Sequence, residues 1–168
     1  MDILTIIGLI ITLLGTLASL YGAWISKKQA ASAKESSNFV KKIKDEIIKR
    51  RETSEISRLN DKLEVSIQEI KIYGPVSSEE KLRGVDHLKI AGTVQDFLIT
   101  LSSYIDLFKG NDKPKADSLK DELTSLLDEF GVEGKSLEEL KESGKKILNS
   151  LNNFSPVLRK NLNKHVEK

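Results

Sequence analysis

Residues 3–25 read ILTIIGLIITLLGTLASLYGAWI and contain no charged side chain. As an α-helix, this stretch would be about 34 Å long, which exceeds the roughly 30 Å hydrocarbon core of a bilayer. A cleaved signal peptide fits less well, because only Met1 and Asp2 precede the apolar run and its apolar region would be shorter. A buried core helix would not need Tyr21 and Trp24 together at one end, where membrane helices carry aromatic residues. The stretch is therefore predicted to be a transmembrane helix.

The charges on either side of this stretch predict its orientation. Asp2 precedes it, whereas residues 27–51, hereafter the basic neck, follow it with nine basic and three acidic residues and a net charge of +6. The positive-inside rule then places the N-terminus outside and the C-terminal domain in the cytoplasm, with the helix in the inner membrane. Six lysines are candidates for contact with lipid headgroups or with the phosphates of a nucleic acid: Lys27, Lys28, Lys34, Lys41, Lys42 and Lys44.

One face of the predicted membrane helix carries only small or hydroxylated residues. They recur at alternating spacings of three and four, and we name them the small-residue ridge: Thr5, Gly8, Thr12, Gly15, Ser19, Gly22 and Ser26. Small residues let helix backbones approach closely, and a 3.5-residue repeat favours a left-handed supercoil. We therefore expect the chain to form a homo-oligomer through this ridge. The same residue types suit either a packed seam of two or three helices or a ring of helices that lines a pore.

The rest of the chain shows the periodicity of amphipathic helices and no alternating β-strand pattern. One apolar stripe, for example, comprises Leu119, Leu123, Leu126, Leu127 and Phe130. Helices are predicted over residues 37–73, 78–109, 115–130, 136–154 and 156–166. The expected fold class is all-α: a transmembrane helix, residues 1–28, followed by an antiparallel cytoplasmic bundle of four to five helices, residues 29–168.

Several boundaries of these helices follow from local chemistry. The Gly-Pro pair at 74–75 is expected to end the first bundle helix, and the Ser-Pro pair at 155–156 to kink or restart the last one. The polar stretch 49–55 shifts the apolar phase and is a candidate bend or break. Residues 30–37 are either a short connector or a continuation of the membrane helix.

Composition excludes several kinds of chemistry. The chain of 168 residues has no cysteine and two histidines, which excludes thiol and disulfide chemistry and makes a metal site implausible. It contains no phosphate-binding loop, nucleophile elbow or metalloprotease motif. Aromatic residues make up 5%, too few for a base-stacking platform. No cofactor and no metal are expected, and the one candidate activity is that of a metal-independent ribonuclease.

The two histidines carry that possibility. His87 is expected to be solvated on the polar edge of its helix, four residues after Arg83. Arg159 and His165 both lie in the last helix, about 120° apart around it, so they would converge only with a group from another helix or subunit. An Arg beside a His could bind a phosphodiester, remove the proton of a 2′-hydroxyl and stabilise the developing charge.

A helical bundle that carries Arg159 and His165 in this spacing on its last helix resembles the HEPN domain, a family with many metal-independent ribonucleases that form composite sites on dimerisation. Behind a single N-terminal membrane helix, such a bundle further resembles the small membrane accessory proteins of type VI-B CRISPR systems. The resemblance implies that Arg159 and His165 occupy the motif positions. It also implies an oligomer in the cytoplasmic membrane that encloses a pore and acts in antiviral defence alongside an RNA-guided nuclease.

The sequence thus supports three hypotheses. The first is a single-pass membrane protein that oligomerises and forms a pore or perturbs the membrane, with membrane lipids, further copies of itself, and RNA or an RNA-guided nuclease complex as partners. The second is a non-enzymatic membrane anchor whose bundle recruits a partner. The third is a membrane-tethered HEPN-type ribonuclease.

Overall fold

The computed structural model describes residues 2–75, 77–132 and 134–166, and for residues 79, 165 and 166 it describes the backbone only. The described residues are 89% helical and include no strand, so the all-α prediction is confirmed. Two compact units follow one another along the chain, Met1–Ile48 and Lys49–Lys168, and each is described by itself.

The membrane candidate and the basic neck belong to one helix, α1 (Ile3–Ile70), which is followed by a single 3₁₀ turn, η1 (Lys71–Tyr73). Residues 30–37 are therefore a helical continuation, and the polar stretch 49–55 does not break the helix. Lys, Arg and Glu are good helix formers, and Arg51 donates to Glu55 Oε1 at 2.8 Å, one helical turn away.

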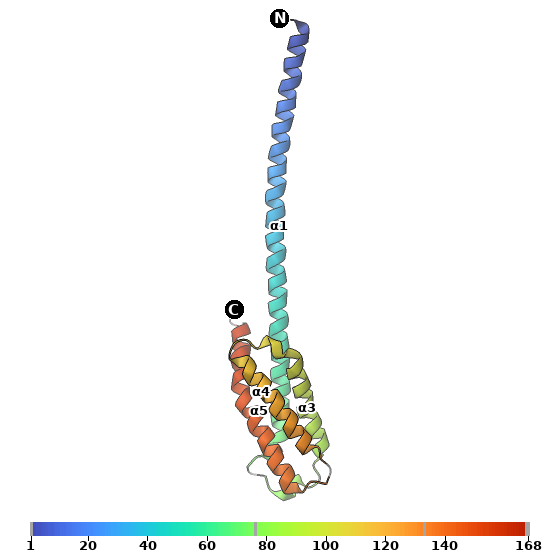
Figure 1. The fold of residues 1–168 in the computed structure, drawn as a ribbon, viewed down its shortest axis with the longest axis vertical. Helices are drawn as coiled ribbons and strands as arrows, with labels where there is room; N and C mark the ends of the chain where they lie inside the picture. The colour runs from blue at the N-terminus through green and yellow to red at the C-terminus, as the bar shows by residue number, and fades with distance from the viewer. Residues whose placement is uncertain (1, 76, 133, 167–168) are drawn as a thin grey trace. The chain divides into compact units, whose positions relative to one another are not determined.

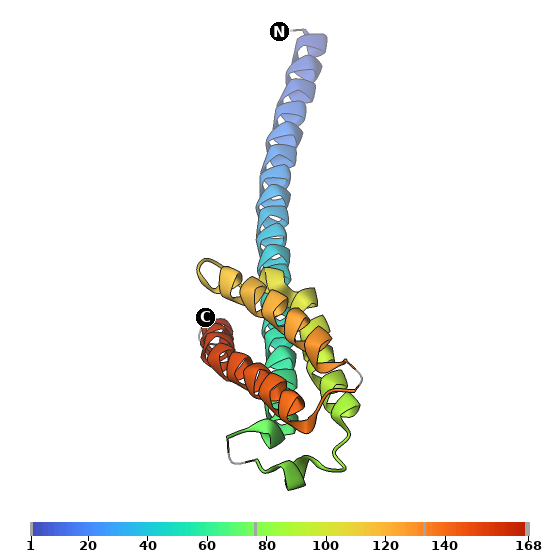
Figure 2. The ribbon, with the colours of Figure 1, turned by 60° about the horizontal axis from the view of Figure 1, so that its bottom comes forward.

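Four helices pack together in the second unit (Figure 1). They are the part of α1 after residue 49, α3 (His87–Tyr104), α4 (Asp112–Phe130) and α5 (Leu137–Val166). Followed along the chain they run alternately in opposite directions, and the short α2 (Glu79–Leu82) lies in the connection between α1 and α3 (Figure 2). This alternation of direction agrees with the antiparallel arrangement expected from the sequence.

The single helix expected over residues 78–109 is wrong. Gly84 has a φ of 82°, in the left-handed region that glycine adopts without a steric penalty, and it separates α2 from α3. Asp86 then caps α3, because its side chain accepts a hydrogen bond from the backbone N–H of Lys89 at 2.9 Å. At the other end, α3 passes into a 3₁₀ turn, η2 (Ile105–Leu107).

Two prolines lie inside helices. Pro114 falls in the first turn of α4, where a missing N–H has no consequence, so α4 begins three residues earlier than expected, at Asp112. Pro156 lies within α5, which continues to Val166 without a separate terminal helix. Phe154 and Leu158, on either side of Pro156, are both buried, so packing against the bundle holds this part of α5 in place.

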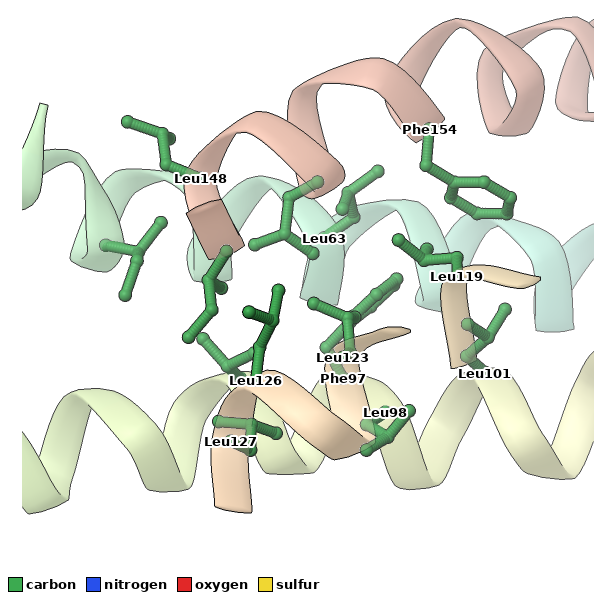
Figure 3. Packing of buried hydrophobic residues seen from close by; sticks show 14 of the residues in the cluster. Leu63, Phe97, Leu98, Leu101, Leu119, Leu123, Leu126, Leu127, Leu148 and Phe154 are labelled. Atoms are coloured by element: carbon green, nitrogen blue, oxygen red, sulfur yellow. The ribbon is translucent and has the colours of Figure 1, made fainter. Parts of the chain in front are cut away.

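The core of the bundle is one cluster of buried side chains drawn from all four helices (Figure 3). Leu63 comes from α1, Phe97 from α3, Leu123 from α4 and Leu151 from α5, and each is 0% exposed. The stripe of α4 listed above is buried as predicted. Its spacing of three and four residues places those side chains on one face of the helix.

Candidate membrane segment and polar sites

The apolar part of α1 is exposed among the described residues. Its isoleucines and leucines up to Leu20 are exposed, from 46% for Ile6 to 82% for Leu4. By length and composition, α1 is the one helix among the described residues that is long and apolar enough to cross a membrane, and no part of its most apolar window is buried. A helix that exposes apolar side chains on every side is typical of contact with lipid or with other copies of the chain.

The small-residue ridge is open along its length. A Cβ atom added to Gly8, Gly15 or Gly22 would meet no other atom within 4 Å. The hydroxyl of Thr12 donates to the carbonyl oxygen of Gly8 at 2.8 Å, and that of Ser19 to the carbonyl oxygen of Gly15 at 2.9 Å. These hydroxyl donors are satisfied within the helix. The ridge therefore favours association chiefly because its glycines let another helix approach the backbone closely.

Aromatic and basic side chains gather at the cytoplasmic end predicted for the span. The rings of Tyr21 and Trp24 stack with centroids 6.2 Å apart, and the ammonium of Lys28 lies 5.7 Å from the centre of the Trp24 ring. Amphipathic rings and lysines are typical of the headgroup level of a bilayer.

The six predicted contact lysines are all exposed on α1, but they lie at different heights along it. At 1.5 Å per residue, Lys27, Lys28 and Lys34 lie within about 14 Å of Ile25, whereas Lys41, Lys42 and Lys44 lie about 24–29 Å beyond it. A straight helix therefore does not present all six to the same surface.

The structure describes the side chain of Arg159 but not that of His165. The guanidinium of Arg159 on α5 donates to Glu64 Oε1 on α1 at 2.7 Å, so it is engaged in an exposed ion pair on the surface of the bundle. The side chain of His165 lies outside the described residues. Sequence reasoning missed the pair of Arg159 with Glu64 because the two residues are 95 positions apart.

The expectation of a solvated His87 is wrong. His87 is half-buried, and its Nδ1 shares a hydrogen bond with the phenol oxygen of Tyr73. Tyr73 is 0% exposed, and burial raises the pKa of Tyr73 to about 12 because the charged phenolate is disfavoured away from water. The ring of Phe130 meets that of Tyr73 edge to face, with centroids 5.4 Å apart.

Tyr73 also explains Gly144 on α5. A Cβ atom at position 144 would lie 2.4 Å from Cγ of Tyr73 and 2.8 Å from its Cβ and Cδ1. The Cβ atom of Tyr73 is fixed by the backbone of η1, so rotating the ring cannot relieve this clash. Gly144 is therefore required for the close approach of α5 to η1, whereas the sequence pattern alone indicates only a member of an apolar stripe.

A buried carboxylate joins α4 to the end of α5. Asp112 is 4% exposed and accepts hydrogen bonds from Asn161 Nδ2 at 3.2 Å and Lys164 Nζ at 3.0 Å. The hydrogen bond from Lys164 holds the pKa of Asp112 below its usual range. Asp112 falls between the helices predicted over residues 78–109 and 115–130, and no sequence pattern singled it out. Its partners are all supplied by the fold, which indicates a structural role.

The described part of the bundle offers no evident reactive centre. Among the described residues, no group of three or more His, Asp or Glu side chains is placed to hold a metal ion. The described residues that line an open groove of about 640 Å³ beside Lys71, Lys81 and Asn152 include no histidine or carboxylate, so they offer no acid–base pair.

No protein-family model matches the chain, and no characterised protein or solved structure is significantly similar to it. The class of protein is set by the fold itself. It is an all-α chain in which one long helix carries an exposed apolar segment at its N-terminal end and contributes its other end to a four-helix core.

Proposed function

We propose that this chain is a single-pass membrane protein that self-associates through the small-residue ridge, and that the assembly breaches the permeability barrier of the membrane. One observation carries the proposal: a 23-residue apolar segment of α1, exposed at every position from residue 3 to residue 24, bears a single in-register ridge of small and hydroxylated residues. Each leucine or isoleucine left in water forgoes about 1.5–3 kcal/mol of transfer free energy, so such a segment favours a lipid environment.

The ends of the segment support one orientation. The Tyr21, Trp24 and Lys28 cluster suits a headgroup layer, and the lysines that follow favour the cytoplasmic side. Lys27, Lys28 and Lys34 lie close enough to the membrane to meet anionic headgroups. The bundle then projects into the cytoplasm and the N-terminus lies outside.

The small-residue ridge is suited both to association of helices and to lining a water-filled pore. Because nothing within 4 Å fills the space over its three glycines, a neighbouring helix can approach the backbone there directly. The hydroxyls of Thr12 and Ser19 donate within their own helix yet keep acceptor lone pairs, which water or a neighbouring chain can use. In a ring of helices, such a face lines a polar lumen while the Ile and Leu faces meet lipid.

Release of a trapped dye from vesicles of phosphatidylethanolamine and phosphatidylglycerol tests this function. We expect the wild-type chain to release dye, and the Gly15→Leu/Ser19→Leu variant to release it at least about tenfold more slowly, because two leucines block close approach along the ridge. The substitution at Gly15 should not disturb the fold of a single chain, since the space over Gly15 is open.

The matched control changes the size of side chains on the face of α1 opposite the small-residue ridge. Ile10→Ala with Leu17→Ala alters two lipid-facing positions and should leave release within about twofold of wild type. Flotation with the vesicles confirms that each variant is inserted. Equal release by the ridge variant would remove the ridge from the mechanism, and no release by wild type would favour an anchor that recruits a partner.

A further inference from the structure

The spacing of the small-residue ridge continues beyond the membrane segment. Counted on from Ser26 in the same alternating steps of three and four, the next positions on α1, hereafter the neck seam, are Gln29, Ala33, Ser36, Val40, Ile43 and Ile47. None is charged, although nine of the 21 residues from 27 to 47 are. The ridge sets these six positions before the residues of the neck are considered. If the nine charged residues were placed at random among the 21 positions, all six seam positions would be uncharged in about 2% of cases.

The far end of the neck seam is apolar and uncovered. Val40 is 64% exposed, Ile43 40% and Ile47 60%, and Phe39 beside them is 64% exposed. Scattered single apolar residues are ordinary on a surface, but here they form one strip along a helix whose other faces carry lysines and acids. A strip of this kind is typical of a helix that pairs with another helix.

The membrane surface cannot be what covers this strip. Val40 lies about 22 Å beyond Ile25 along α1, whereas the headgroup layer extends only about 5–8 Å past the hydrocarbon core. Lying flat on the bilayer would require a break between residues 25 and 40. The structure shows α1 as one helix through this range.

We propose that the neck seam packs against the same seam of other copies as a parallel, in-register coiled coil that continues the assembly of the membrane ridge. This inference rests on the proposed function, because insertion in one orientation makes the copies parallel and raises their effective concentration. In heptad terms Val40 and Ile47 occupy a positions and Ile43 a d position. β-Branched residues at both positions favour assemblies of more than two strands.

The flanks of the seam are compatible with this packing. Lys44 and Glu46 lie on either side of it and have opposite charges, so neighbouring copies need not oppose like charges. The remaining lysines of the neck face away from the seam, toward water. A supercoil is needed for the whole seam to stay in contact, because in a straight helix the repeat drifts by about 20° per heptad, or about 120° from Thr5 to Ile47.

Disulfide trapping in membranes tests the neck seam directly, because the natural chain has no cysteine and every introduced one is unique. Single variants Val40→Cys, Ile43→Cys and Ile47→Cys are compared with Asn38→Cys and Asp45→Cys, which lie on the opposite face of the same turns. The full-length chain is inserted in phosphatidylethanolamine–phosphatidylglycerol vesicles and oxidised briefly with copper phenanthroline. The seam variants should form covalent dimers about tenfold faster, because a disulfide needs Cα atoms within about 7 Å.

A Gly8→Cys variant in the membrane ridge separates the two proposals. Fast trapping at Gly8→Cys with equal rates at Val40→Cys and Asn38→Cys would overturn the neck coiled coil and leave membrane association standing. Fast trapping in the neck without trapping at the ridge would support the coiled coil and contradict association through the ridge. Slow trapping at every position would contradict both. Folding of the bundle is not at risk, since none of the neck positions belongs to the core.

Discussion

Gly144→Ala should destabilise the bundle by about 3 kcal/mol or more, although it adds a single methyl group. That methyl would lie 2.4 Å from Cγ of Tyr73, far inside van der Waals contact, so α5 and η1 must separate. Separation would also disturb the hydrogen bond between Tyr73 and His87 and the edge-to-face contact of Tyr73 with Phe130. Urea unfolding of the full-length chain in detergent, followed by circular dichroism, measures the change in the free energy of unfolding.

Gly92→Ala is the matched control, because Gly92 also lies inside a helix but has open space where the Cβ would be added. Alanine there should raise the free energy of unfolding by about 0.5–1 kcal/mol, since glycine is the poorer helix former. If Gly144→Ala were as stable as Gly92→Ala, the tight packing of α5 on Tyr73 would be refuted.

Leu63→Ala should lower the free energy of unfolding by about 2–5 kcal/mol, because it leaves a cavity in the core. Leu63 is 0% exposed and lies on the part of α1 that belongs to the bundle. The substitution tests whether the helix that carries the apolar N-terminal segment is also an integral part of the bundle core. The same urea titration measures the loss.

Val65→Ala, two residues further along α1, serves as its control. Val65 is 53% exposed, so removing its methyl groups should change the free energy of unfolding by about 0.5 kcal/mol or less. Equal effects of the two substitutions would show that this end of α1 does not pack into the bundle as described.

Patterns that depend on neighbouring residues were predictable from the sequence. The all-α class and the stripe from Leu119 to Phe130 follow from the spacing of apolar residues, because a helix brings residues three and four apart to one face. The apolar run of α1 was evident because residues 3–25 contain no charged side chain. The break at Gly84 was missed, because an isolated glycine inside a helical pattern is usually tolerated and only its positive φ reveals the turn.

Contacts between distant parts of the chain were not predictable. Gly144 approaches Tyr73 across 71 positions, and Asp112 meets Lys164 across 52. A single sequence contains nothing that pairs such residues, since each has an ordinary local role: Gly144 in a stripe, Asp112 beside a turn. The ion pair of Arg159 with Glu64 belongs to the same category, and it gives Arg159 a structural partner that the HEPN-like interpretation of the last helix did not foresee.

The central claim is that copies of this chain associate along the small-residue ridge, and native mass spectrometry of the full-length protein released from detergent micelles tests it most directly. The chain has a mass of 18.8 kDa. We predict a discrete assembly of three or more copies for wild type and its collapse to single chains in Gly15→Leu/Ser19→Leu. A wild-type mass of one or two copies, or an assembly that persists in the ridge variant, would contradict the account.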